Sequence, residues 1–176
     1  MLFPDDKNGG KPGKMTAAAL LTAAALIVHV VEAQIPPLTP VAGIKMGLSN
    51  IFTLAALRLL GGGWASLVIL ARILLGGLIA GQPSAILYSL AGGIPSFLLC
   101  VAVYRLFPES RFWVISPISA ITHNLGQIVL AVFITQTPEL FVYFPVLVIS
   151  GIITGAFTGI CAQMTISRLQ ETGALR

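Results

Sequence analysis

The stretch ILLGGLIAGQPSAILYSLAGGIPSFLLCVAVY, residues 73–104, contains no charged side chain. A single Gly-Gln-Pro segment at residues 81–83 divides it into two apolar runs, and these residue types favour a turn. A helix needs about 20 residues to cross the hydrocarbon core of a bilayer. The stretch therefore predicts parts of two membrane-spanning helices joined by a short turn.

The composition of the whole chain agrees with a membrane protein. Hydrophobic residues make up 56% of the 176 residues and charged residues only 9%, against about 25% charged in soluble domains. A soluble fold of this size cannot bury so much apolar surface. The net charge is +4, but the basic residues stand singly between apolar runs, so they indicate membrane topology and not nucleic-acid binding.

Six apolar runs are separated by Gly, Pro and charged residues, and they predict an all-α integral membrane protein with a six-helix transmembrane bundle. The runs are 15–33, 46–60, 64–80, 84–107, 114–135 and 140–169. We expect a transmembrane domain at residues 14–170, preceded by a flexible cytoplasmic tail at 1–13 and followed by a cytoplasmic tail at 171–176.

The basic residues predict that both ends of the chain lie in the cytoplasm. With the N-terminus inside, the outer segments hold only Lys45. The inner segments hold Lys7, Lys11, Lys14, Arg58, Arg105, Arg111, Arg168 and Arg176. Because cytoplasmic loops carry an excess of Lys and Arg, this asymmetry favours the N-in, C-in orientation.

Polar side chains at membrane depth are costly, so each is a candidate functional residue. They come from four of the predicted segments and gather in the outer half of the bundle or near its midplane. The candidate substrate-binding residues are Glu32, Lys45, Asn50, Arg72, His123, Asn124 and Gln127. We expect an outward-opening cavity for a small solute with hydrogen-bonding and anionic groups, in which Arg72 and Lys45 face the anion.

Structural roles are the alternative for the same residues. Arg72 is equally explained by pairing with Glu32 or with a helix carbonyl. The segment His123-Asn124-Leu125-Gly126-Gln127 would then supply interhelical hydrogen bonds, worth about 0.6 kcal/mol each in membranes. A further polar residue, His29, stands alone near the outer end of the first run, where an interfacial position is expected.

Small residues recur four positions apart and allow helices to approach closely in lipid. Such pairs or triplets occur at Gly151, Gly155 and Gly159, at Gly77 and Gly81, and at Ala19 and Ala23. Packing inside the protein is the first interpretation of each, and docking of another membrane subunit is the second.

The sequence offers no catalytic or cofactor-binding motif. No Gly-rich segment is followed by Lys and Ser or Thr, so no phosphate-binding loop is expected. The carboxylates outside the N-terminal tail are scattered singly, and no Cys/His cluster suggests zinc. Cys100 and Cys161 fall within apolar runs and are expected to be small buried hydrophobes. We therefore expect neither an enzyme nor a bound metal or cofactor.

The size, helix number and orientation, together with the AxxxA pattern of Ala19 and Ala23, resemble the substrate-binding S components of energy-coupling-factor (ECF) transporters. In that family the AxxxA stripe docks on a transmembrane scaffold subunit, which joins two cytoplasmic ATPases. The resemblance implies a multi-pass protein of the bacterial cytoplasmic membrane. It also implies that the solute binds on the outer side and that the S component topples to deliver it inward.

Two segments, 43–50 (GIKMGLSN) and 123–127 (HNLGQ), are similar to the Gx transporter family, many members of which are labelled heptaprenyl diphosphate synthase component I. The likeness spans residues 15–169. Three functions stay open: a solute-binding transport subunit, an accessory membrane subunit of isoprenoid or quinone synthesis, and a scaffold without a ligand.

Overall fold

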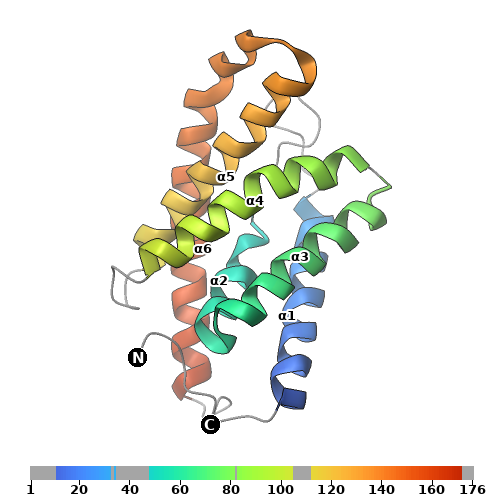
Figure 1. Cartoon of the computed structure of the whole chain (residues 1–176). Coiled ribbons are helices and arrows are strands. Elements are labelled where there is room, and N and C mark those ends of the chain that lie inside the picture. Colours follow the sequence, from blue (N-terminus) through green and yellow to red (C-terminus); the bar gives the residue numbers. More distant parts are fainter. Residues whose placement is uncertain (1–10, 33, 35–47, 82, 105–111, 172–176) are drawn as a thin grey trace.

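The structure is a computed structural model that describes residues 11–32, 34, 48–81, 83–104 and 112–171, and these residues are almost entirely helical (Figure 1). No β-strand occurs among them, which confirms the predicted all-α class. The elements are α1 (Lys11–Glu32), α2 (Asn50–Leu60), α3 (Gly62–Ile79), α4 (Pro83–Tyr104), α5 (Phe112–Thr135), the 3-10 helix η2 (Pro138–Tyr143) and α6 (Phe144–Glu171).

Five helices are long and apolar enough to cross a membrane: α1, α3, α4, α5, and η2 continued by α6 over Pro138–Arg168. Large apolar side chains also remain exposed on them, for example Leu78 (70% exposed) and Phe133 (73%). In a bilayer these side chains face lipid and not water. The chain is thus a multi-pass membrane protein.

The second predicted span forms a shorter helix than expected. Helix α2 has 11 residues, which extend about 16 Å at about 1.5 Å per residue, whereas the hydrocarbon core is about 30 Å thick. It ends at Gly61, whose φ of 87° is easily adopted only by glycine. Because residues 46 and 47 lie outside the described part of the chain, the count of six spanning helices stays a prediction.

The other predicted boundaries agree with the structure to within a few residues. The turn between α3 and α4 contains Gly81 with a φ of 62°, so this glycine serves a turn and not a packing stripe with Gly77. Helix α1 begins at Lys11, inside the predicted tail, because Pro12 is tolerated in a first helical turn. The tail segments 1–10 and 172–176 lie outside the described residues.

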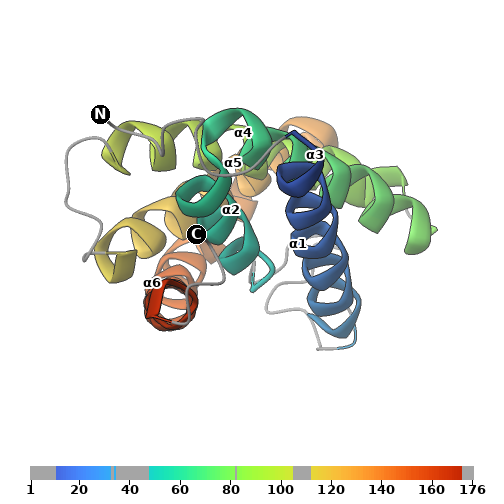
Figure 2. The same cartoon turned by 90° about the horizontal axis from the view of Figure 1, so that it is seen from below.

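The helices form two groups, α1–α3 and α4–α6, which are joined by contacts of α2 with α6 and of α3 with α4. The closest-packed pairs are α5 with α6 and α4 with α5, while α1 packs on α3. Helix α2 contacts α1, α3 and α6 and lies between α1 and α6 when the molecule is seen from below (Figure 2). Helix α1 begins and α6 ends at the same end of the molecule (Figure 1), as expected if both tails lie on one side of the membrane.

The glycine stripe of α6 packs against α5, which confirms the first interpretation of that pattern. A Cβ atom on Gly155 would lie 2.5 Å from the Cα of Pro117, and one on Gly159 would lie 2.6 Å from the carbonyl oxygen of Phe112. Gly151 also faces α5 but less tightly, since a Cβ there would lie 3.2 Å from Asn124 Nδ2 and 3.3 Å from the backbone nitrogen of Ile121. The missing side chains therefore set how closely α5 and α6 approach.

Where α4 crosses α5, Gly126 packs against a carbonyl group that Pro95 leaves without its usual helix hydrogen bond. Pro95 has no N–H, so the carbonyl of Ala91 lacks its usual intrahelical donor. A Cβ on Gly126 would lie 2.2 Å from that carbonyl oxygen, so a Cα hydrogen of Gly126 is directed at it. Such Cα–H···O contacts are common between closely packed helices and partly satisfy the oxygen.

The main apolar core lies toward the end of the molecule where α2 meets α3 and α4 is followed by α5. It includes Leu54, Leu57, Val68, Ile115 and Ile166. Tyr104, the last residue of α4, stacks on Phe112, the first of α5, with 5.7 Å between ring centroids. Cys100 is buried in this core, as predicted.

We expect Gly159→Ala to lower the thermal stability of the purified protein. The added methyl group would overlap the backbone of α5 at Phe112 and Trp113, and such overpacking costs about 1–3 kcal/mol. The control is Gly63→Ala, because a Cβ at Gly63 meets no atom within 4 Å. Equal melting temperatures of the two variants in detergent would contradict the proposed contact.

Candidate functional site

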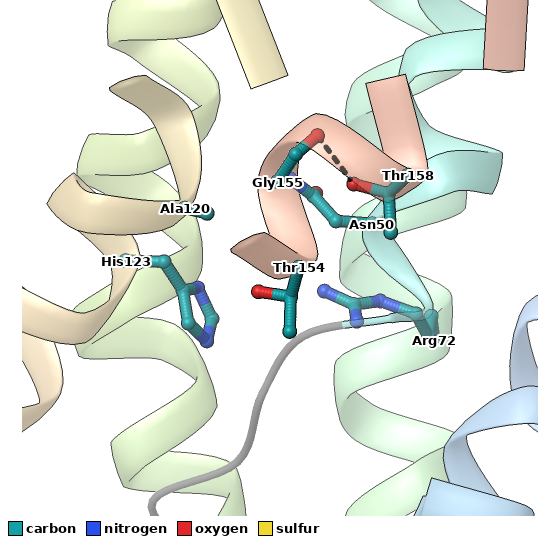
Figure 3. A pocket seen from close by; sticks show the side chains of 7 residues that line it. All are labelled: Asn50, Arg72, Ala120, His123, Thr154, Gly155 and Thr158. Atoms are coloured by element: carbon teal, nitrogen blue, oxygen red, sulfur yellow. Dashed lines mark hydrogen bonds between the residues drawn. The ribbon is translucent and has the colours of Figure 1, made fainter. Parts of the chain in front are cut away.

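A polar pocket lies between α2, α3, α5 and α6 (Figure 3). The empty space around its lining atoms is about 320 Å³, which includes space open to the surroundings, but only about 10 Å³ is wide enough for the centre of a water molecule. The lining side chains must therefore separate to admit a solute. The pocket is lined by Asn50, Arg72, Ala120, His123, Thr154, Gly155 and Thr158.

Arg72 is the only permanently charged side chain among the described residues that line the pocket. It lies on the buried face of α3 with Val68, Ile69 and Gly76, and it is only 5% exposed. Its Nη1 donates a hydrogen bond to Ser49, whereas its Nε has no acceptor within the described chain. In Figure 3 the guanidinium is directed toward Thr154 and His123.

His123 lies across the pocket from Arg72 (Figure 3) and interacts with it electrostatically. The His123 ring also lies against the backbone of Gly92 on α4. A Cβ on Gly92 would lie 2.9 Å from His123 Nδ1, so the glycine makes room for the ring. The His123 ring is therefore placed by a tight contact between α4 and α5.

The remaining polar side chains come from α2 and α6. Asn50 is the first residue of α2, so the partial positive charge of that helix N-terminus lies at the pocket wall. Thr154 Oγ1 donates to the carbonyl oxygen of Ser150 (2.8 Å). Thr158 shares a hydrogen bond of 2.9 Å with Ser116 on α5.

Glu32, the last residue of α1, is 4% exposed and interacts electrostatically with Arg72. It does not line the pocket. Arg72 therefore lines the pocket while the negative charge of Glu32 acts on it from α1. Lys45, the second cation predicted for the site, lies outside the described residues.

The structure places Asn124 and Gln127 outside the pocket lining, in helix-helix contacts. Asn124 is 2% exposed, and its Nδ2 donates to the carbonyl oxygen of Leu147 on α6 (2.8 Å). Gln127 is 1% exposed and packs against Gly92 on α4. Of the three polar residues in the 123–127 segment, only His123 thus reaches the pocket.

His29 was expected at the membrane interface and is instead buried, with 7% exposure. A Cβ on Gly76 would lie 2.9 Å from its Cδ2 atom, so the ring fills the space that Gly76 leaves on α3. No sequence pattern indicates this contact, because it depends on how α1 and α3 cross.

The sequence prediction missed Ser49, Thr154 and Thr158. Hydroxyl side chains are common in membrane helices, where they often bond to their own backbone, as Thr154 does. No spacing signal marked these three residues. Asn50, Arg72 and His123 were found because amide, guanidinium and imidazole groups are rare at membrane depth.

The arrangement is suited to binding an anionic group, because one guanidinium faces an imidazole and several hydroxyl and amide groups in a protected pocket. No group of three or more His, Cys, Asp or Glu side chains close enough to hold a metal ion occurs in the described part of the chain.

Fold and site together define a helical multi-pass membrane protein with a polar pocket within its helix bundle. In a comparison with protein families, the family model described as heptaprenyl diphosphate synthase component I matches residues 21–165. The chain belongs to this family, which confirms the family label expected from the 43–50 and 123–127 segments. No curated protein and no solved structure matches the chain.

We expect Asn124→Ala to destabilise the fold without changing occupancy of the pocket. The substitution removes the hydrogen bond to Leu147, and interhelical hydrogen bonds in membranes contribute about 0.6 kcal/mol, up to about 1.7. Thermal unfolding in detergent measures the stability, and mass spectrometry of the retained small molecules measures occupancy. If Asn124→Ala empties the pocket while the protein stays folded, Asn124 is a ligand-binding residue after all.

Proposed function

We propose that this protein is the solute-binding membrane subunit of an ATP-driven, ECF-type uptake transporter, and that its solute is small and carries an anionic group. The observation that carries the proposal is the Arg72 guanidinium, which is buried in a membrane-spanning helix and directed into a polar pocket. Ionisable side chains at membrane depth are costly, and they typically mark solute pathways and binding sites.

The proposed partners are a transmembrane scaffold subunit and two cytoplasmic ATPases. Ala19 and Ala23 are both exposed on α1, one turn apart, while Ala18 and Ala25 face the interior. A stripe of small exposed residues allows the helix of another subunit to approach closely. The chain itself contains no phosphate-binding loop, so ATP hydrolysis is assigned to the partners and the chain is proposed to have no catalytic activity.

The proposed location is the bacterial cytoplasmic membrane, with the start of α1 and the end of α6 at the cytoplasmic side. Eight basic residues on the inner segments against one on the outer segments support this orientation. The pocket residues Arg72 and His123 then lie near the middle of the bilayer, since each stands near the middle of its helix.

A second candidate is an accessory membrane subunit of isoprenoid or quinone synthesis. The observation that favours it is the family description, which names heptaprenyl diphosphate synthase and, as component I, implies a second component. Arg72 would then bind a diphosphate group. This candidate predicts association with a soluble synthase and not with ATPases.

We expect wild-type protein purified in mild detergent to retain a water-soluble small molecule at about one per chain, and Arg72→Ala and His123→Ala to lose it. Removing one charged hydrogen-bonding group costs about 1.5–3 kcal/mol, or roughly 10- to 150-fold in affinity. Native mass spectrometry followed by identification of the extracted molecule measures this.

The control for that experiment is Arg168→Ala, because the Arg168 side chain is 83% exposed and far along α6 from the pocket. A prenyl diphosphate in the extract would favour the isoprenoid candidate. Variants that lose only thermal stability, with the small molecule retained, would indicate a scaffold in which Arg72 and His123 are structural.

We expect Ala19→Leu and Ala23→Leu to abolish co-purification of a membrane scaffold with its ATPases while the pocket stays occupied. Leucine would hold a partner helix away from α1. Thr165→Leu is the control, because Thr165 is equally exposed to the surroundings on α6. Co-purification of ATPases that is the same in all three variants would contradict docking at the α1 stripe.

A further inference from the structure

The Arg72 guanidinium presents one buried donor that the described protein does not use. Its Nη1 is bonded to Ser49, but its Nε has no acceptor within the described chain, although the residue is only 5% exposed. A buried donor without an acceptor is destabilising, and such groups are rare in native proteins. An acceptor that enters the pocket would complete this site.

The Nε–H group of Arg72 can form one half of a binding site for a planar anion. The Nε–H of arginine points alongside a neighbouring Nη–H, and the two form a fork that matches the two oxygens of a carboxylate or phosphate. Since Nη1 is engaged by Ser49, the edge that contains Nε is the one that remains for a ligand. A lysine at this position would supply the charge without the fork.

The charge balance around the pocket favours a single negative charge. Arg72 is the one permanent cation among the described lining residues, and Glu32 already interacts with it electrostatically. A ligand with one charge leaves a small net charge in a region of low dielectric constant. A diphosphate would bring two or more negative charges against the same single cation, and burying unpaired charge is strongly unfavourable.

The space and its lining favour a compact polar molecule. Only about 10 Å³ of the pocket is wide enough for the centre of a water molecule. A solute must therefore move the walls apart, and a small molecule requires the least movement. Asn50, His123 and Thr154 supply hydrogen-bonding groups on the walls. A long prenyl chain would require a much larger separation of the walls than a compact molecule.

We propose that the pocket is selective for a compact monocarboxylate with further hydrogen-bonding groups, and that its carboxylate binds edge-on to the Nε side of Arg72. This inference rests on the proposed solute-binding function and narrows it to one class of ligand. It also separates the transport candidate from the isoprenoid candidate, since a prenyl diphosphate carries more negative charge and is much larger than a compact monocarboxylate.

The test combines chemistry on the extracted molecule with one conservative variant. From wild-type protein in detergent, we expect a molecule that gains one methyl ester in acidic methanol and is unchanged by alkaline phosphatase. Arg72→Lys keeps the charge, and we expect its occupancy to fall at least about tenfold. Arg168→Lys is the matched control and should retain the molecule at the wild-type level.

A probe panel, measured as thermal stabilisation of the same wild-type protein, covers the case of an empty extract. The panel pairs nicotinate with nicotinamide and lactate with lactamide, and adds glycerol 3-phosphate and isopentenyl diphosphate. Stabilisation by a carboxylate and not by its amide or by the phosphates supports the proposal. Stabilisation only by the amides or the phosphates overturns it.

Two further outcomes separate failure of this inference from failure of the proposed function. If the extracted molecule carries phosphate, or if Arg72→Lys retains it while Arg72→Ala loses it, the carboxylate assignment is wrong and the solute-binding function stands. If the wild-type extract is empty and no probe stabilises the protein, both the assignment and the solute-binding function are contradicted.

Discussion

The placement of one positive charge inside an apolar helix bundle is the constraint on which the rest of the site depends. An arginine near the middle of a membrane-spanning helix is unfavourable unless neighbouring groups compensate it. Here Ser49 accepts a hydrogen bond from Arg72, and Glu32 supplies an opposite charge from α1. Helices α1, α2 and α3 meet around this side chain. The groups that compensate the charge of Arg72 are therefore held in place by the packing of these three helices.

The opposite wall of the pocket depends on small residues. Gly92 and Gly126 bring α4 and α5 into backbone contact, and this contact places the His123 ring. Gly155 and Gly159 do the same for α5 and α6, which brings Thr154 and Thr158 to the pocket. In lipid, where no hydrophobic effect drives helices together, such close contacts are a main source of association energy.

The division of the helices into two groups, α1–α3 and α4–α6, relates the fold to the proposed function. Helices α4, α5 and α6 are tightly packed through glycines, and Arg72 approaches them from α3, on the side of the molecule that includes α1 and α2. The pocket lies where the two groups meet, and a solute that bridges Arg72 and His123 would stabilise their contact. Because the pocket is narrow as described, admission of a solute requires the groups to separate.

The sequence by itself determined the class of protein, five of the spans and most helix boundaries, because these follow from the length of apolar runs and from Gly and Pro at their ends. It also selected Arg72, His123, Asn50 and Glu32, since ionisable and amide groups are rare at membrane depth. Only the tertiary structure decided that Asn124 and Gln127 stabilise helix contacts, that Ser49, Thr154 and Thr158 join the site, and that His29 is buried. The physical reason is that these roles depend on how two helices cross and rotate, which is set by close packing between residues far apart in the chain.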